Sequence, residues 1–169
     1  KPATPGEVVL SIKDLHVKDE RGIEQVNGFN LDIRAGEIVG LAGIDGNGQK
    51  ELADAINALV KPESGTITVK GEEIQGTTPK TVIDHAVATI PSDRHRWGLV
   101  LPFTVAENMV LERHNEEAFG KGIALDLAKI KEFSQKLIDE FDIRPAECAD
   151  HQAAGLSGGN QQKVIIARE

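Results

Sequence analysis

A glycine-rich stretch between an apolar segment and a predicted helix is the part of the sequence best suited to hold a phosphate. It contains Gly43, Gly46 and Gly48, and the predicted helix begins at Gln49. Glycines can take positive φ angles that turn successive backbone N–H groups toward one point, and a helix N-terminus adds about half a positive charge. We therefore expect an anion-binding loop here, with an ordinary strand-to-helix turn as the structural alternative.

The residues after the last glycine differ from those of a loop that holds magnesium and a triphosphate. Such a loop usually ends Gly-Lys-Ser/Thr, where the lysine contacts the β and γ phosphates and the hydroxyl binds magnesium. Here Gln49 takes the place of the lysine and Lys50 that of the hydroxyl, so the loop keeps its shape and loses this chemistry. The candidate nucleotide-binding residues are Gly43, Ile44, Asp45, Gly46, Asn47, Gly48, Gln49, Lys50 and Glu51.

Composition and charge restrict the class of protein. The 169 residues are 40% hydrophobic and 27% charged, which is typical of a folded domain. The net charge of -8 argues against nucleic acid as a partner, because such binding needs clustered lysine and arginine. The single Cys148 excludes an internal disulfide, and no apolar run reaches the roughly 20 residues of a membrane span. With no signal-peptide pattern, we expect a cytoplasmic protein.

The apolar patterns predict the elements that position the loop. Predicted strands span 8–17, 25–33, 37–42, 65–70 and 86–90, the first two forming a small antiparallel sheet. A helix over 49–60 follows the loop, and Thr78-Pro79 opens another. Strands that alternate with helices indicate an α/β fold.

From Phe103 onward the pattern is helical only, which predicts an inserted helical subdomain. Residues 104–107 form a capping box for a helix to about residue 113, and Asp126 caps a second helix. The expected apolar stripe of that second helix consists of Leu127, Ile130, Phe133, Leu137 and Phe141. Within it, 137–140 resembles the apolar run ending in Asp-Glu of a nucleotidase, but an amphipathic helix with solvent-facing acids explains these residues fully.

The most specific motif is a serine and two glycines at a helix start, which together offer N–H donors to an anion. It consists of Leu156, Ser157, Gly158, Gly159, Asn160 and Gln161. The motif resembles the signature of ATP-binding cassette (ABC) ATPases and lies, as in that family, roughly a hundred residues after the glycine loop. The resemblance implies an α/β P-loop NTPase (RecA-like) ABC cassette core with an N-terminal antiparallel β-subdomain and an inserted α-helical subdomain. The implied parts are a linker at 1–7, the core at 8–102, the helical subdomain at 103–155 and the signature segment at 156–169.

Two further segments, Ile44 to Gln49 and Ile90 to Leu99, resemble the second cassette of tandem importer ATPases for nucleosides and simple sugars. This resemblance implies ATP and Mg²⁺ as cofactors and a head-to-tail partner cassette in the same polypeptide. It also implies membrane permease subunits and, indirectly, a substrate-binding protein as partners at the cytoplasmic face of the plasma membrane. In such a pair the signature of one cassette contacts the γ-phosphate of ATP held by the other. The signature here would therefore serve the partner's ATP, while the chain's own loop is degenerate.

The sequence departs from the ordinary cassette pattern in the residues that would contact magnesium and adenine. Ser92 and Asp93 stand at the position of the glutamine loop, where a glutamine usually touches magnesium and the attacking water. The adenine-stacking aromatic is missing, and the corresponding turn offers Glu20, Arg21 or, less well placed, His16. An arginine can stack weakly through a cation–π contact.

The Asp-Glu strand and the switch histidine of the family would follow the signature. The sequence ends at Glu169, so we expect a truncated cassette with no catalytic residue of its own. We also expect no metal site, because His85, His114 and His151 are scattered at no ligand spacing.

The loop around the only tryptophan is a candidate docking surface. Arg94, Arg96 and Trp97 combine an aromatic with arginines, which is the composition of interface anchors, and the resemblance places them beside the groove for membrane-subunit helices. A phosphate contact or a solvated loop is an alternative for the arginines. Trp97 could instead fold back onto the helical subdomain as a core residue.

Two functions from different classes remain open. In the first, the chain is part of an ATPase that drives import, and its competence lies in the assembled pair of cassettes. In the second, it is a non-catalytic docking cassette that binds nucleotide weakly or not at all. A chromosome-maintenance ATPase would need a long coiled-coil insertion between loop and signature, for which the sequence has no room.

Overall fold

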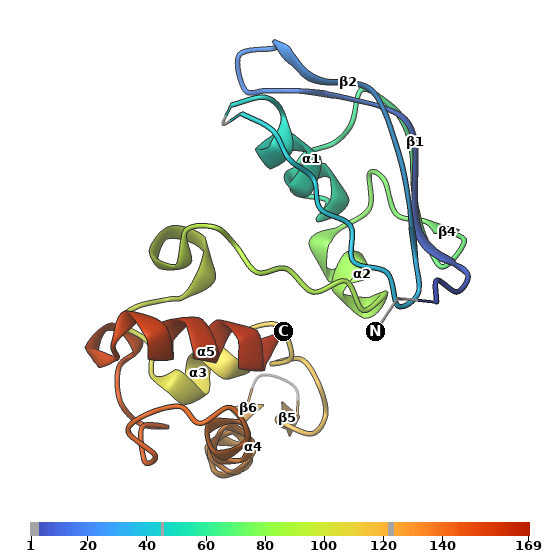
Figure 1. Cartoon of the computed structure of the whole chain (residues 1–169). Helices are drawn as coiled ribbons and strands as arrows, with labels where there is room; N and C mark the ends of the chain where they lie inside the picture. The colour runs from blue at the N-terminus through green and yellow to red at the C-terminus, as the bar shows by residue number, and fades with distance from the viewer. Residues whose placement is uncertain (1–3, 45, 122–123) are drawn as a thin grey trace. The chain divides into compact units, whose positions relative to one another are not determined.

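The computed structural model describes residues 4–44, 46–121 and 124–169, without the side chain of residue 121. The chain divides into two compact units, Lys1–Val87 (the N-terminal unit) and Ala88–Glu169 (the C-terminal unit) (Figure 1). Each unit has its own hydrophobic core. In the described part of the chain, no helix is both long and apolar enough to cross a membrane.

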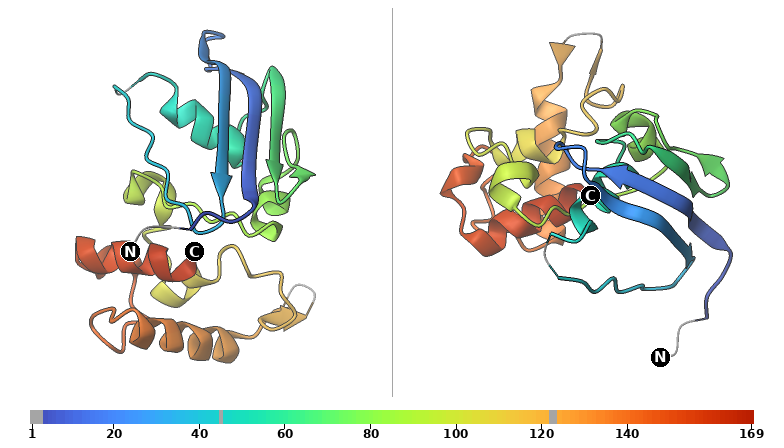
Figure 2. Two further views of the ribbon diagram at one scale, coloured as in Figure 1. Left: turned by 45° about the vertical axis from the view of Figure 1, so that its right-hand side comes forward. Right: turned by 90° about the horizontal axis from the view of Figure 1, so that it is seen from above.

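The N-terminal unit is built on an antiparallel sheet with the strand order β2-β1-β3-β4 (Figure 2). The strands are β1 (Val8–Lys18), β2 (Glu24–Arg34), β3 (Ser64–Val69) and β4 (Glu72–Glu73). The pairing of β1 with β2 confirms the predicted antiparallel hairpin. Its turn is fixed by Asp19, whose carboxylate accepts hydrogen bonds from the backbone N–H groups of Arg21 and Ile23, both at 2.9 Å.

Two helices, α1 (Gln49–Ile56) and α2 (Pro79–Asp84), share the core of this sheet. Helix α2 begins as predicted, because the Thr78 hydroxyl accepts from the N–H of Thr81 at 3.3 Å and proline fixes the first helical φ. Helix α1 ends four residues earlier than predicted, since Ala58 adopts a left-handed φ of 55°. The core consists of Ile12, Leu15, Val17, Val26, Leu52, Ala55, Ile67, Val69, Ile74 and Val82.

The predictions of buried strands over 37–42 and 86–90 are wrong for the described structure, in which both segments lack strand structure. Ile38 is 99% exposed and Ile90 55% exposed. A strand of a parallel sheet is stable only when neighbouring strands satisfy its backbone and layers cover both faces. Within the described residues, no strand pairs with either segment, so their apolar sequences remain in irregular, exposed backbone.

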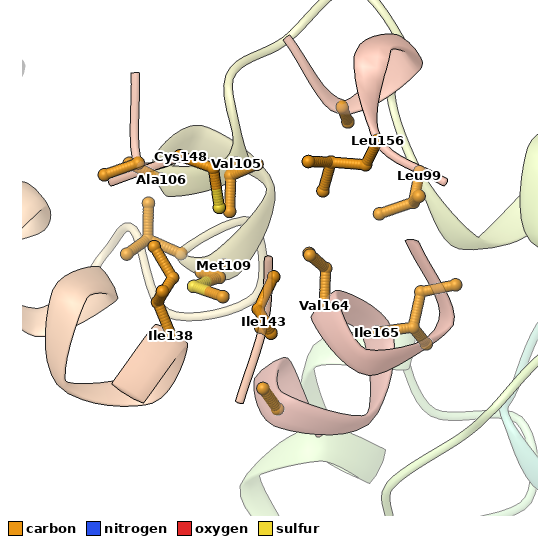
Figure 3. Packing of buried hydrophobic residues seen from close by; sticks show 14 of the residues in the cluster. Leu99, Val105, Ala106, Met109, Ile138, Ile143, Cys148, Leu156, Val164 and Ile165 are labelled. Carbon is orange, nitrogen blue, oxygen red and sulfur yellow. The ribbon is translucent and has the colours of Figure 1, made fainter. Parts of the chain in front are cut away.

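The C-terminal unit packs α3 (Val105–Met109), α4 (Leu127–Glu140) and α5 (Gly158–Arg168) around one apolar cluster, part of which is drawn in Figure 3. The predicted capping box of α3 is confirmed, although that helix ends at Met109 rather than near residue 113. Short turns occur at η1 (Arg94–Gly98) and η2 (Ala153–Gly155). A small hairpin of β5 (Gly120–Lys121) and β6 (Ala124–Leu125) corrects the expectation of a purely helical segment.

Most of the predicted stripe of α4 is confirmed, because Ile130 is buried and Phe133, Leu137 and Phe141 pack against the core. Its fully buried positions are Ile130, Ser134 and Ile138, spaced four residues apart, whereas Leu127 is 69% exposed. A buried serine is tolerated because its hydroxyl donates to the Ile130 carbonyl at 2.8 Å. The Asp-Glu pair at 139–140 lies in this helix, so the interpretation of 137–140 as an amphipathic helix is confirmed.

Candidate nucleotide-binding half-sites

The glycine loop brings the end of the irregular segment 37–44 against the start of α1. Gly46 and Gly48 adopt positive φ angles of 83° and 89°, as expected, but Gly43 does not, so the expectation for that glycine is wrong. A Cβ on Gly43 would overlap the side-chain amide of Gln49, so that side chain would have to move. A Cβ on Gly48 would overlap the backbone carbonyl of Gln25 in β2, which fixes how closely the sheet approaches the loop. The candidate Asp45 lies outside the described residues.

Gln49 folds back into the loop that precedes it. Its Nε2 donates to the carbonyl of Ile44 at 3.1 Å, and its Oε1 accepts from the N–H of Asn47 at 3.2 Å. The Asn47 N–H is one of the donors that a bound phosphate would use, so the glutamine side chain competes with an anion for it. Gln49, which takes the position of the phosphate-binding lysine, therefore closes the loop by bonding to Ile44 and Asn47.

Lys50 does not replace the missing lysine. Its Nζ forms an ion pair with the Asp54 carboxylate at 2.6 Å, one helical turn along α1. The hydrogen bond to Asp54 is the main cause of a raised pKa for Lys50. Because the Lys50 side chain runs toward the C-terminal end of α1, its positive charge is paired with Asp54 rather than with the loop.

A hollow of about 280 Å³ lies beside the loop, and none of the described residues that line it is charged. Its walls combine amides and apolar groups, namely Gln25, Val26, Asn27, Phe29, Leu41, Ala42, Gly43, Ile44, Asn47, Gly48, Gln49 and Leu52. A triphosphate needs cationic or metal neutralisation of its charge, and magnesium needs hydroxyl, carboxylate or phosphate oxygens in octahedral geometry. The described residues also contain no cluster of three or more metal-ligating side chains. Among its described residues, the lining of this hollow therefore offers neither a cationic side chain nor a hydroxyl.

The turn expected to meet adenine is occupied by ion pairs. The Arg21 guanidinium binds the Asp19 carboxylate through Nη2 at 2.7 Å and Nε at 3.0 Å, and this arginine lowers the pKa of Asp19 to about 2. His16 contacts Glu24 at 2.6 Å, which raises the pKa of the imidazole. Both candidates are therefore paired with a carboxylate, although the Arg21 side chain remains 73% exposed.

The signature residues form an open helix N-terminus in the C-terminal unit. Ser157 caps α5, and its Oγ accepts from the backbone N–H of Asn160 at 3.5 Å and from its side-chain amide at 3.0 Å. Leu156, 7% exposed, anchors the motif in the core. Gly159 is exposed, with open space around the position of a Cβ. In contrast to the glycine loop, this helix start leaves room for an anion at its first N–H groups.

The segment predicted to hold the glutamine-loop and docking residues forms the turn η1. The Asp93 carboxylate caps it by accepting from the N–H groups of His95 and Arg96, at 3.0 and 3.1 Å, while Ser92 is exposed. Trp97 is 62% exposed, so it does not fold into the core as the alternative expected, and the Arg96 guanidinium lies 4.8 Å from its ring centroid.

Arg94 takes a different direction from the other two candidate docking residues. Its Nε donates to Gln161 Oε1 at 3.4 Å, and a Cβ on Gly158 would lie 2.8 Å from its Nη2. Sequence reasoning missed the partner of His95, whose Nε2 contacts the same Gln161 oxygen at 2.8 Å. The two residues are 66 positions apart, and no local pattern indicates that they meet.

Solved structures show the fold to which these half-sites belong. An ATP-binding cassette of an ABC transporter, MJ1267, is similar with a TM-score of 0.74 and 17% identity, over 96% of this chain and 64% of that chain. The cbiO1 protein of Clostridium perfringens, part of the ABC transporter complex cbiONQ, is similar with a TM-score of 0.68 and 20% identity, over 96% and 61%. The predicted fold class, an ABC cassette of the P-loop NTPase type with an antiparallel sheet and helices, is confirmed.

Sequence comparison establishes the family. The profile of the ABC transporter family matches residues 26–169, and the chain belongs to the ATP-binding proteins of that family. A nucleoside import ATP-binding protein of Lactococcus lactis, NupA, is 50% identical over 99% of this chain and 33% of the relative. A guanosine import ATP-binding protein of Bacillus subtilis, NupO, is 45% identical over 100% and 33%, and a glucose import ATP-binding protein of Haloferax volcanii, TsgD13, 40% over 98% and 30%. The chain thus spans about a third of the length of these relatives.

Proposed function

We propose that this chain is part of the ATP-binding subunit of an ABC importer for a nucleoside or simple sugar, and that it contributes a signature rather than a working phosphate loop. The carrying observation is the contrast between a glycine loop closed by Gln49 and an open signature at Ser157. The names of the relatives support the class of cargo.

We propose the same organisation that the sequence predicts. Residues 1–7 act as a linker, 8–102 as the core, 103–155 as the helical subdomain and 156–169 as the signature segment of a second cassette that continues beyond this chain. The partner cassette lies in the same polypeptide, docked head to tail, and permease subunits hold the pair at the cytoplasmic face of the plasma membrane. The residues proposed for permease contact are Arg94, Arg96 and Trp97.

The role of the signature is electrostatic. ATP and Mg²⁺, bound to the partner cassette, supply the phosphoryl chemistry. In this chain, Ser157 holds the start of α5, and the first-turn N–H groups at Gly158 and Gly159 have no intrahelical acceptor, so they can donate to an oxyanion. Because Gly159 has no side chain and stands in open space, an anion can approach the backbone closely.

A second candidate, a non-catalytic docking cassette, is favoured by the closed glycine loop alone. In that case neither half-site would affect ATP hydrolysis, and the exposed Trp97 would be the functional feature. The two candidates differ in what the signature does.

The test compares matched variants of the full-length protein by phosphate release. Gly159→Asp places a negative charge in open space at the helix start without a steric conflict, so we expect it to abolish most ATPase activity. We expect the same result for Gly158→Asp and Ser157→Arg. Gln49→Ala removes the loop-closing amide, and we expect it to change activity much less. Equal loss in Gln49→Ala and Gly159→Asp would contradict the proposed division of roles, and full activity in Gly159→Asp would favour the docking cassette.

A further inference from the structure

We propose that Arg94 is a further residue of the signature half-site, where its guanidinium adds a positive charge to the phosphate that the first N–H groups of α5 contact. The source of that phosphate, ATP bound to the partner cassette, rests on the proposed function. The role belongs to the Arg94 side chain alone and is additional to the permease contact proposed for its turn.

The Arg94 guanidinium lies against the first residue of α5, within the C-terminal unit. A Cβ built on Gly158 would lie 2.8 Å from Arg94 Nη2 and 3.4 Å from its Cζ. A larger residue at position 158 would therefore need the space that the guanidinium fills. The glycine lets the arginine approach the backbone at the helix start.

Arg94 has no ion pair among the residues that the structure describes, although the chain has 27 acidic residues against 19 lysines and arginines. The other four arginines of the C-terminal unit are all paired: Arg113, Arg144 and Arg168 with carboxylates, and Arg96 with the Trp97 ring. A half-buried charge is costly when nothing neutralises it. An unpaired guanidinium in an acidic chain is therefore placed to meet an anion from outside the chain.

The position of the guanidinium is unfavourable unless an anion is bound. A helix N-terminus carries about half a positive charge, and the N–H groups of Gly158 and Gly159 have no intrahelical acceptor. A guanidinium brings only further donors and a full positive charge. An oxyanion would satisfy both groups, because it accepts from the backbone N–H groups and forms charge-assisted hydrogen bonds with the arginine.

Gln161 holds the guanidinium in this direction. Its Oε1 accepts from Arg94 Nε at 3.4 Å, while its Nε2 donates to the Ala153 carbonyl at 3.0 Å. Because this amide is 5% exposed and bonded at both ends, its oxygen stays turned toward the arginine. The contact uses Nε and leaves both Nη groups, which have no acceptor among the described residues, for a pair of phosphate oxygens.

This arrangement assigns Arg94 an electrostatic role in hydrolysis at the partner's site. An arginine supplied from a second domain stabilises the charge that develops on a transferred phosphoryl group. The backbone donors of the signature remain without it, so its removal should reduce hydrolysis rather than abolish it.

Binding of inorganic phosphate to the 169-residue chain tests the site without hydrolysis. Thermal unfolding is followed with increasing phosphate, against sodium chloride at matched ionic strength. Phosphate should raise the midpoint of the parent, because a ligand that binds only the folded state stabilises it. The shift should be lost in Arg94→Gln and largely kept in Arg94→Lys, which retains the charge.

The matched control is Arg144→Gln, which removes the same charge beside the same motif. The Arg144 backbone N–H donates to Asn160 Oδ1 at 2.9 Å, but its guanidinium is paired with Asp142 at 2.6 Å. We expect this control to keep the phosphate shift. In the full-length protein, phosphate release should fall at least tenfold in Arg94→Gln and stay within about twofold of the parent in Arg144→Gln.

The unfolding midpoint without phosphate separates this role from a structural one. We expect it to be unchanged or raised in Arg94→Gln, since the substitution removes a positive charge from the positive end of α5. A lowered midpoint, a parent chain that phosphate does not stabilise, or an equal phosphate shift in Arg94→Gln and the parent would each overturn the inference.

The two proposals fail in different ways. Full ATPase activity in Gly159→Asp would contradict the proposed function. Loss of activity in Gly159→Asp together with parental activity in Arg94→Gln would leave the proposed function standing and reject the role of Arg94.

Discussion

Restoring a lysine to the glycine loop should convert it into a measurable nucleotide site. The perturbation is the double substitution Gln49→Lys with Lys50→Ser in the 169-residue chain. It removes the amide that closes the loop, places a cation at the phosphate position and provides the hydroxyl that magnesium requires.

The magnitude follows from the contacts that change. In the parent, an anion must displace the hydrogen bond between Gln49 and the Asn47 N–H, which contributes roughly 0.5 to 1.5 kcal/mol. The new lysine adds a charge-assisted hydrogen bond of roughly 1.5 to 3 kcal/mol. Their sum is about 2 to 4.5 kcal/mol, and 1.4 kcal/mol is a tenfold change in affinity, so we expect Mg-ATP to bind at least tenfold more tightly.

Titration calorimetry with Mg-ATP measures the difference directly. Gln49→Ala separates the two contributions, because it opens the loop without supplying charge and should give only the smaller gain. Lys50→Ser is the matched control, since it breaks only the ion pair with Asp54 and should give no gain. Micromolar affinity in the unmodified chain, or no improvement in the double variant, would refute the reasoning.

Three further predictions concern the core, the docking turn and pH. Asn108 is fully buried, donates to the carbonyls of Val100 and Thr104 at 3.1 and 2.9 Å, and accepts from the Val100 N–H at 2.8 Å. Asn108→Ala should therefore lower the free energy of unfolding by about 2 to 3 kcal/mol. Urea denaturation measures this change, and an unchanged midpoint would contradict the prediction. Trp97 should emit as an exposed indole and be readily quenched by iodide, whereas a blue-shifted, protected emission would reject the docking role. Asp19 has a pKa of about 2 in the folded chain, below its usual value of 3.8, so its stabilising contribution is present above pH 4 and is lost as the pH falls toward 2. When thermal unfolding is compared at pH 4.5 and 2.5, Asp19→Asn should therefore lose less stability on acidification than the parent. Equal losses in the two proteins would contradict this prediction.

Local sequence signals predicted the elements whose stabilising contacts are local. The Thr78, Thr104 and Asp126 caps and the Ser157 start of α5 depend on residues within a few positions of each other. The hairpin of β1 and β2 joins consecutive strands through the local turn at Asp19. The strand predictions for 37–42 and 86–90 failed because a buried strand depends on pairing with distant strands, which the described residues do not provide. Apolar composition alone does not create such partners.

The candidate sites show the same difference between features that local sequence predicts and contacts that depend on the fold. The departure of Gln49 from the lysine pattern was visible in the sequence, but its return to Ile44 and Asn47 was not, because side-chain direction depends on the shape of the loop. Likewise, the composition around Trp97 indicated exposure, whereas the contact of His95 with Gln161 joins residues that are far apart in the sequence. The sequence motif shows which chemistry is missing, and the structure shows what occupies its place.

The central claim is that this chain contributes the signature and not the nucleotide-holding loop, and photolabelling of the full-length protein with 8-azido-ATP tests it most directly. Peptide mapping by mass spectrometry should locate the label outside residues 1–169, and Gly159→Asp should reduce nucleotide trapping even though the label lies elsewhere. Labelling of peptides from the turn at 19–24 or the loop at 43–51 with comparable yield would contradict the account.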